Sequence, residues 1–132
     1  MKENKTIWNG YPIIGDTKEL DFILTSEGFI NIEMDDIISS LSLAENNYVT
    51  SGHATTLSAA FTSAVGKLPT TLNKAKSLLI QFVYGDKQVE MAELSSVTEK
   101  LNEVSSEMSL RWGIAADSSL DEDFKVIILL SE

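Results

Sequence analysis

The sequence predicts an α+β domain in two layers, a mixed four-stranded sheet with helices packed on one face. Three observations carry this expectation. Residues 78–84 form a continuous apolar run, short enough to be a central strand buried on both faces. Residues 57–68 and 91–104 repeat apolar side chains at the three-to-four spacing of amphipathic helices. From residue 48 onward the predicted order is strand, helix, strand, helix, strand, strand.

The opening of the chain is polar and gives no clear periodicity over about fifteen residues. We therefore treat residues 1–19 as an N-terminal extension of uncertain order and residues 20–132 as the domain. In residues 16–27, clustered apolar side chains indicate a short helix that Gly28 ends.

A second helix is expected to begin just after Asn31, where acidic residues precede an apolar stripe. Glu33, Asp35 and Asp36 lie near its start, where the helix dipole favours negative charge. Taken without any resemblance, this pattern is typical of capping and dipole compensation. An arrangement of carboxylates for chemistry is the alternative.

A strand is expected over residues 48–53, followed by a helix that Thr55 or Thr56 caps and Pro69 ends. The next helix has an apolar stripe made of Met91, Leu94, Val97, Leu101 and Val104. Residues 108–115 and 124–130 are predicted strands. Because a short loop joins them, we expect them to pair antiparallel as a hairpin.

Composition and charge limit the compartment and the partners that can be expected for this chain. The chain has 132 residues, 43% of them hydrophobic, which suits one domain with its own core. It contains no cysteine, which favours a reducing compartment, so we expect a cytoplasmic protein. No apolar stretch is long enough to cross a bilayer, and nothing at the start resembles a secretory signal. The net charge of −10 disfavours nucleic acid and direct membrane binding.

Three other segments could be taken for metal or phosphate sites, but a structural or surface role explains each of them better. His53, the only histidine, is expected to be structural or surface-exposed, because no second ligand accompanies it. The acidic residues in 117–123 lack the ligand spacing of a calcium loop, so a solvated loop is predicted. Residues 10–17, GYPIIGDT, have the glycine spacing of a phosphate loop but place Asp16 where a lysine is needed. An ordinary turn built on Gly10, Pro12 and Gly15 is expected there.

Two aromatic side chains in the last two predicted strands, Trp112 and Phe124, are expected in the core rather than on a binding surface.

Four segments, read together, carry a resemblance to a known family. They are GFINIEMDDI, YVTSGHAT, SLLIQFVYGDKQVEMAEL and RWGIAADSSLDEDFKVIILL. In the same order they resemble the C-terminal domain of the bacterial tubulin-like cell-division GTPase FtsZ, over about residues 20–130. The family pattern G-L-I-N-x-D-x-x-D-[VI] is matched by residues 28–37, with Glu33 in place of the first aspartate.

The resemblance implies a division of labour between subunits. Family members bind GTP in an N-terminal domain and stack head to tail, so that each subunit completes its neighbour's nucleotide pocket. Carried over, Asn31 and Asp35 belong to the contact with the neighbour. Glu33 and Asp36 orient or polarise the water that attacks the terminal phosphate. Glu33 is one methylene longer than the family's aspartate, which alters that positioning.

The glycine-rich phosphate loop of the family is missing, since none of the seven glycines cluster. The chain is therefore not expected to hydrolyse GTP alone, and no cofactor or metal is assigned to it. GTP would be held by a partner subunit. The long linker and terminal peptide of the family are also not expected after Glu132.

Three functions remain open. The first is an assembly module that docks on a tubulin-like GTPase or on itself. The second is one part of a complete polymerising GTPase, supplying activating acids in trans. The third is a small-molecule enzyme on a two-layer fold, because fold alone does not fix function.

Overall fold

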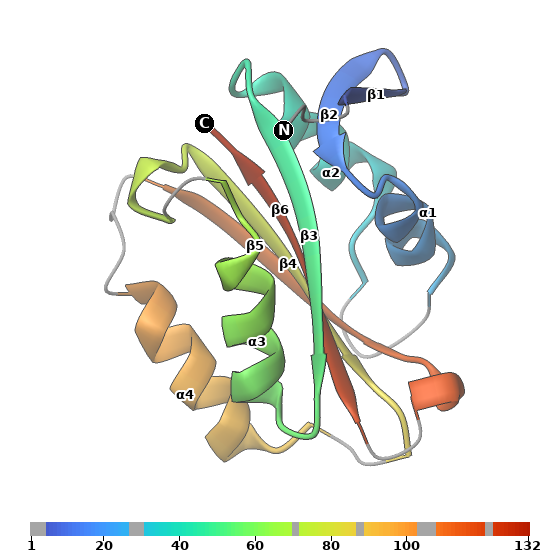
Figure 1. The fold of residues 1–132 in the computed structure, drawn as a ribbon, viewed down its shortest axis with the longest axis vertical. Coiled ribbons are helices and arrows are strands. Elements are labelled where there is room, and N and C mark those ends of the chain that lie inside the picture. Colours follow the sequence, from blue (N-terminus) through green and yellow to red (C-terminus); the bar gives the residue numbers. More distant parts are fainter. Residues whose placement is uncertain (1–4, 27–30, 70–71, 87–88, 103–107, 121–122) are drawn as a thin grey trace.

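The computed structural model describes residues 5–26, 31–69, 72–86, 89–102, 108–120 and 123–132. They form one mixed six-stranded sheet flanked by helices (Figure 1). The strands are β1 (Lys5–Trp8), β2 (Tyr11–Gly15), β3 (Asn47–Ala54), β4 (Ser77–Tyr84), β5 (Ser109–Ala116) and β6 (Phe124–Ser131). The α-helices are α1 (Lys18–Thr25), α2 (Met34–Ser42), α3 (Leu57–Gly66) and α4 (Met91–Asn102), with 3-10 turns η1 (Leu72–Lys74) and η2 (Ser118–Leu120).

The α+β class and the order strand, helix, strand, helix, strand, strand from β3 onward are confirmed. The strand count was wrong, because the sheet has six strands rather than four. The two additional strands, β1 and β2, come from the polar opening of the chain. Their hairpin turns at Asn9 and Gly10, which both have positive φ angles (47° and 85°), as a type I′ turn requires.

The turn expected on three residues of the opening is therefore only partly correct. Gly10 lies in the turn, whereas Pro12 and Gly15 belong to strand β2. β2 then runs parallel to β3 along the pairs Ile14 with Tyr48 and Gly15 with Val49.

The expected hairpin of the last two strands was also wrong. β6 lies between β3 and β4 and pairs antiparallel with both over all eight of its residues. β5 pairs parallel with the outer side of β4. Burial explains this order, because every residue of β6 except Lys125 is buried, so β6 belongs in the centre. β5 carries the exposed Arg111 and lies at the edge.

Helices cover both faces of the sheet rather than one, which corrects the two-layer expectation (Figure 1). On β4, Leu78, Ile80 and Phe82 pack towards α3 and α4. Leu79 and Val83 point the other way, into a second cluster with α1, α2 and the β1–β2 hairpin. A central strand that is apolar on both sides needs cover on both sides, and the N-terminal elements provide the second cover.

The helices α3 and α4 largely follow their sequence signals. Thr56 is the N-cap of α3, and its hydroxyl accepts a hydrogen bond of 3.1 Å from the Ala59 amide. On α4, Leu94, Val97 and Leu101 are buried. Met91 was wrongly placed in that stripe, since it is 75% exposed. Val104 lies outside the described residues. Among the described helices, none is long and apolar enough to cross a membrane.

Candidate functional site

The acidic residues of the segment GFINIEMDDI, residues 28–37, lie at the start of α2. Glu33 is the N-cap residue, with an extended backbone, and the helix begins at Met34. The carboxylate of Asp36 accepts the Glu33 amide through Oδ2 at 3.0 Å, which satisfies a donor that the helix leaves unpaired. The capping interpretation of this carboxylate is therefore confirmed. Residues 28–30 of the segment lie outside the described part of the chain.

The same segment presents its acids at the surface. The side chains of Glu33 and Asp35 are exposed, and that of Asp36 keeps 28% of its surface accessible. Asn31 is exposed as well. Ile32 and Ile37 point into the core cluster shared with α1. The acidic residues between these two isoleucines therefore face solvent.

Arg111 binds Asp36 and completes the site. Its Nη1 atom donates to Asp36 Oδ1 at 2.9 Å, joining edge strand β5 to the first turn of α2. Sequence reasoning missed this residue as part of the site, although it is the single arginine of the chain. Nothing in the strand sequence around Arg111 connects it with α2, because Arg111 and Asp36 are 75 positions apart.

A shallow hollow of about 320 Å³ adjoins this ion pair. Its walls come from the segment before α2 and from β5, and they are formed by Asn31, Ile32, Asp36, Leu110, Arg111 and Trp112. The structure thus brings Asn31 and Asp36 of the predicted set to one hollow. Glu33 and Asp35 do not line it. The ring of Trp112, half-buried, packs edge-on against Phe82 at 6.1 Å between centroids and braces the β5 side.

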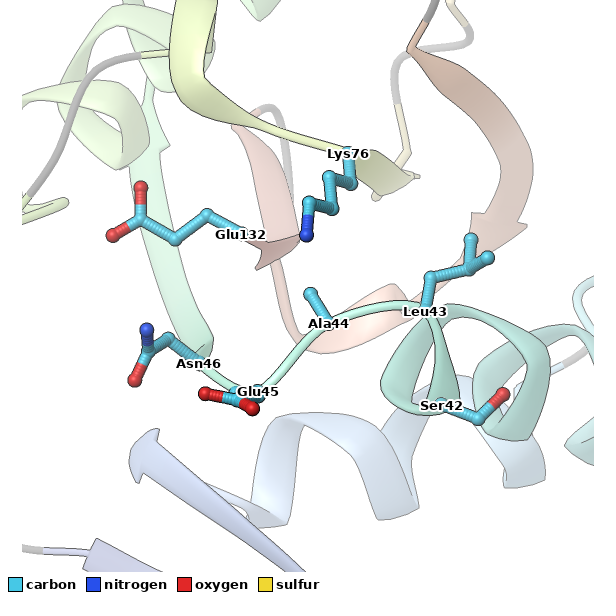
Figure 2. A pocket seen from close by; sticks show the side chains of 7 residues that line it. All are labelled: Ser42, Leu43, Ala44, Glu45, Asn46, Lys76 and Glu132. Carbon is cyan, nitrogen blue, oxygen red and sulfur yellow. The ribbon is translucent and has the colours of Figure 1, made fainter.

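A second, larger hollow of about 550 Å³ lies at the other end of α2 (Figure 2). The end of α2 at Ser42 and the loop 43–46 form one side, and Lys76 and Glu132 form the other. Backbone hydrogen bonds connect the segments that line this hollow. The Lys76 amide donates to Ser131 O at 2.8 Å, and the Glu132 amide donates to Asn46 O at 2.9 Å. With one ammonium and two carboxylates, this hollow suits charged or strongly polar groups. No sequence prediction addressed it.

The remaining candidates stand apart from α2. His53 is exposed at the end of β3 and contacts Asp123 at 3.0 Å, consistent with the predicted surface role. Of the acidic loop, residues 121–122 lie outside the described part, and Asp117 caps η2 through Ser119. Phe124 is fully buried, as expected. Among the described residues, no group of three acidic, histidine or cysteine side chains could hold a metal ion.

The chain has an α+β fold that is also found in solved structures of FtsZ, CetZ and TubZ. It is similar to FtsZ of M. jannaschii, with a TM-score of 0.73 and 17% identity, covering 88% of this chain and 35% of that one. It is also similar to CetZ of Methanosaeta thermophila (TM-score 0.69, 17% identity, 86% and 34% covered). A third similar structure is TubZ of Bacillus thuringiensis serovar israelensis, solved as GDP-form protofilaments. Its TM-score is 0.59 and its identity 13%, and the match covers 80% of this chain and 30% of that one.

The chain thus spans about a third of the length of these structures. At such identities the similarity shows the fold, and at that level the resemblance to the FtsZ C-terminal domain is confirmed. No protein-family model and no curated protein matches the sequence.

Proposed function

We propose that this chain is an assembly domain that docks on a tubulin-like GTPase, or on copies of itself, in cytoplasmic filament formation or cell division. GTP would be bound by the partner, and this chain would supply acidic side chains to the partner's nucleotide. Support comes from the fold, which is shared with FtsZ and with a TubZ solved as a protofilament.

The observation that carries the proposal is the surface position of the acids at the start of α2. Glu33 is exposed and Asp36 is partly exposed at 28%, so a second molecule can reach both carboxylates. Glu33, the N-cap, and Asp36, the third residue of α2, form a capping box, so the two carboxylates lie close together at the start of the helix. Two such anions can hold a water or a cation between them when a partner presents a phosphate.

Charge sets the kind of partner. The chain has a net charge of −10, so a partner surface that is neutral or basic around its nucleotide is favoured over an acidic one. This requirement makes docking on a different, nucleotide-binding chain more favourable than stacking of bare copies. The electrostatic part of the attraction should weaken as salt is added.

The test is to mix the purified chain with a tubulin-like GTPase such as FtsZ of M. jannaschii, then measure GTP turnover and co-sedimentation. We expect the chain to co-sediment and to change turnover. Glu33→Gln and Asp36→Asn should each strongly reduce, but not abolish, the chain's effect on turnover while the chain still docks. Glu99→Gln is the matched control, since Glu99 is an exposed acid on α4, across the sheet. Equal loss in all three variants would contradict the role of the α2 acids.

A second candidate is that the chain acts as one domain of a longer polymerising GTPase. The observation that favours it is the coverage of only about a third of each similar structure. The reading frame upstream of the codon for Met1 tests this: a nucleotide-binding domain encoded in frame would support it, and a stop codon in frame would contradict it.

A further inference from the structure

We propose that Arg111 is a positioning residue that fixes the Asp36 carboxylate for its action on a partner's nucleotide, an inference that rests on the proposed function. Nothing in the sequence pattern around residues 28–37 points to it. The structure does so through one contact, Arg111 Nη1 to Asp36 Oδ1 at 2.9 Å.

Both oxygens of Asp36 are held within the chain. Oδ2 accepts the Glu33 amide at 3.0 Å, and Oδ1 accepts the Arg111 guanidinium. Two hydrogen bonds, one to each oxygen, restrict the rotation of a carboxylate as well as its position. A carboxylate has about four lone-pair sites, so about two remain for a water or a cation. Because 28% of the Asp36 side chain is accessible, those sites can be reached from the adjoining hollow.

The two partners of Asp36 lie in different kinds of structure. Glu33 lies in the irregular segment that enters α2, so a hydrogen bond to its amide follows any shift of that segment. Arg111 lies on β5, which pairs with β4 over all eight residues. Side chains built on paired strands are held more accurately than those on loops. Arg111 thus connects the acid to the fixed frame of the sheet.

Arg111 also supplies positive charge where the proposed function needs it. Glu33, Asp35 and Asp36 lie within four residues of each other, and a triphosphate brought near them would be repelled. The guanidinium offsets one of these charges. It is the single arginine of the chain, and 51% of its side chain stays accessible.

The experiment is a double-mutant cycle on turnover by M. jannaschii FtsZ in the presence of this chain. The variants are Arg111→Gln, Asp36→Asn, the combination of both, and Arg111→Lys. Lys18→Gln is the control, because Lys18 is an exposed cation on α1, a helix that contacts β3. Co-sedimentation and thermal unfolding of each variant are measured in parallel.

We expect Arg111→Gln to reduce the chain's effect on turnover about tenfold, since small displacements of an acting group are costly. The double variant should lose no more than Asp36→Asn alone, because Arg111 acts through Asp36. Arg111→Lys should restore part of the effect, and docking and folding should persist.

Three results would overturn the inference. Full activity of Arg111→Gln would show that Asp36 needs no support. Additive losses in the double variant would show that Arg111 acts independently. Increased activity of Arg111→Gln would show that the arginine blocks the acid. If the wild-type chain neither docks nor changes turnover, the proposed function itself fails, and the inference fails with it.

Discussion

Gly52 on β3 lies directly against the backbone of Ala60 on α3. A β-carbon at residue 52 would come within 2.6 Å of the Ala64 amide nitrogen and closer still to the Ala60 carbonyl oxygen. Since the obstacle is backbone rather than a flexible side chain, α3 itself would have to move. This contact sets how closely the helix approaches the sheet.

Gly52→Ala should therefore destabilise the domain by about 1 to 3 kcal/mol, the usual cost of overpacking a core. Urea unfolding followed by circular dichroism measures the difference. Gly66→Ala is the matched control at the end of the same helix, where an added β-carbon meets nothing within 4 Å. We expect it to be neutral or stabilising by up to about 1 kcal/mol. Equal losses in the two variants would contradict the close approach.

Truncating two apolar side chains near the start of α4 should cost very different amounts of stability. Leu94→Ala is expected to cost about 2 to 5 kcal/mol, because Leu94 is only 7% exposed within the core of that face. Met91→Ala should cost less than about 0.5 kcal/mol, because Met91 is 75% exposed. Chemical denaturation compares the two variants. A large loss at Met91 would restore the original stripe prediction.

The N-cap of α3 offers a third measurement. Thr56→Ala removes the hydroxyl that accepts the Ala59 amide, so we expect a loss of about 0.5 to 2 kcal/mol. Thr56→Ser keeps the acceptor and should retain most of the stability. The alternative cap predicted from sequence, Thr55, should tolerate alanine. Thermal unfolding of the three variants tests which threonine caps the helix in solution.

Two ion pairs with different burial should respond differently to loss of charge. Lys125 and Glu19 contact each other at 2.9 Å with side-chain exposures of 22% and 12%. Glu19→Gln should destabilise the fold by about 1 to 3 kcal/mol, since it leaves a shielded ammonium without its carboxylate. Arg111→Gln breaks a pair that is 51% and 28% exposed and should cost less than about 1 kcal/mol. Equal effects in denaturant titrations would contradict this ranking.

Local signals predicted most of the regular structure from β3 onward. The helix caps, the apolar stripe of α3 and the apolar run of β4 depend on residues that are close in sequence. They can therefore be predicted from the sequence. The placement of β6 depends on pairing with β3 and β4, far apart in the chain. Its almost continuous burial is a signal that favours a central position over a hairpin edge.

The first two strands had a signal that was overlooked. Asn9 and Gly10 form the commonest type of two-residue hairpin turn, between short segments rich in branched and aromatic residues. The site divides in the same way. The acids at the start of α2 could be predicted as a local motif, whereas the contact of Asp36 with Arg111 exists only after the sheet has formed.

The hairpin of β1 and β2 contributes Trp8 and Ile13 to the layer beneath α1 and α2. Trp8 also donates from its indole to Asp21 at 3.0 Å, which ties the hairpin to α1. Anyone grafting this unit into another protein must therefore transfer its opening residues with it. A graft that began at residue 20 would expose apolar side chains of this layer, and the recipient protein would have to cover them.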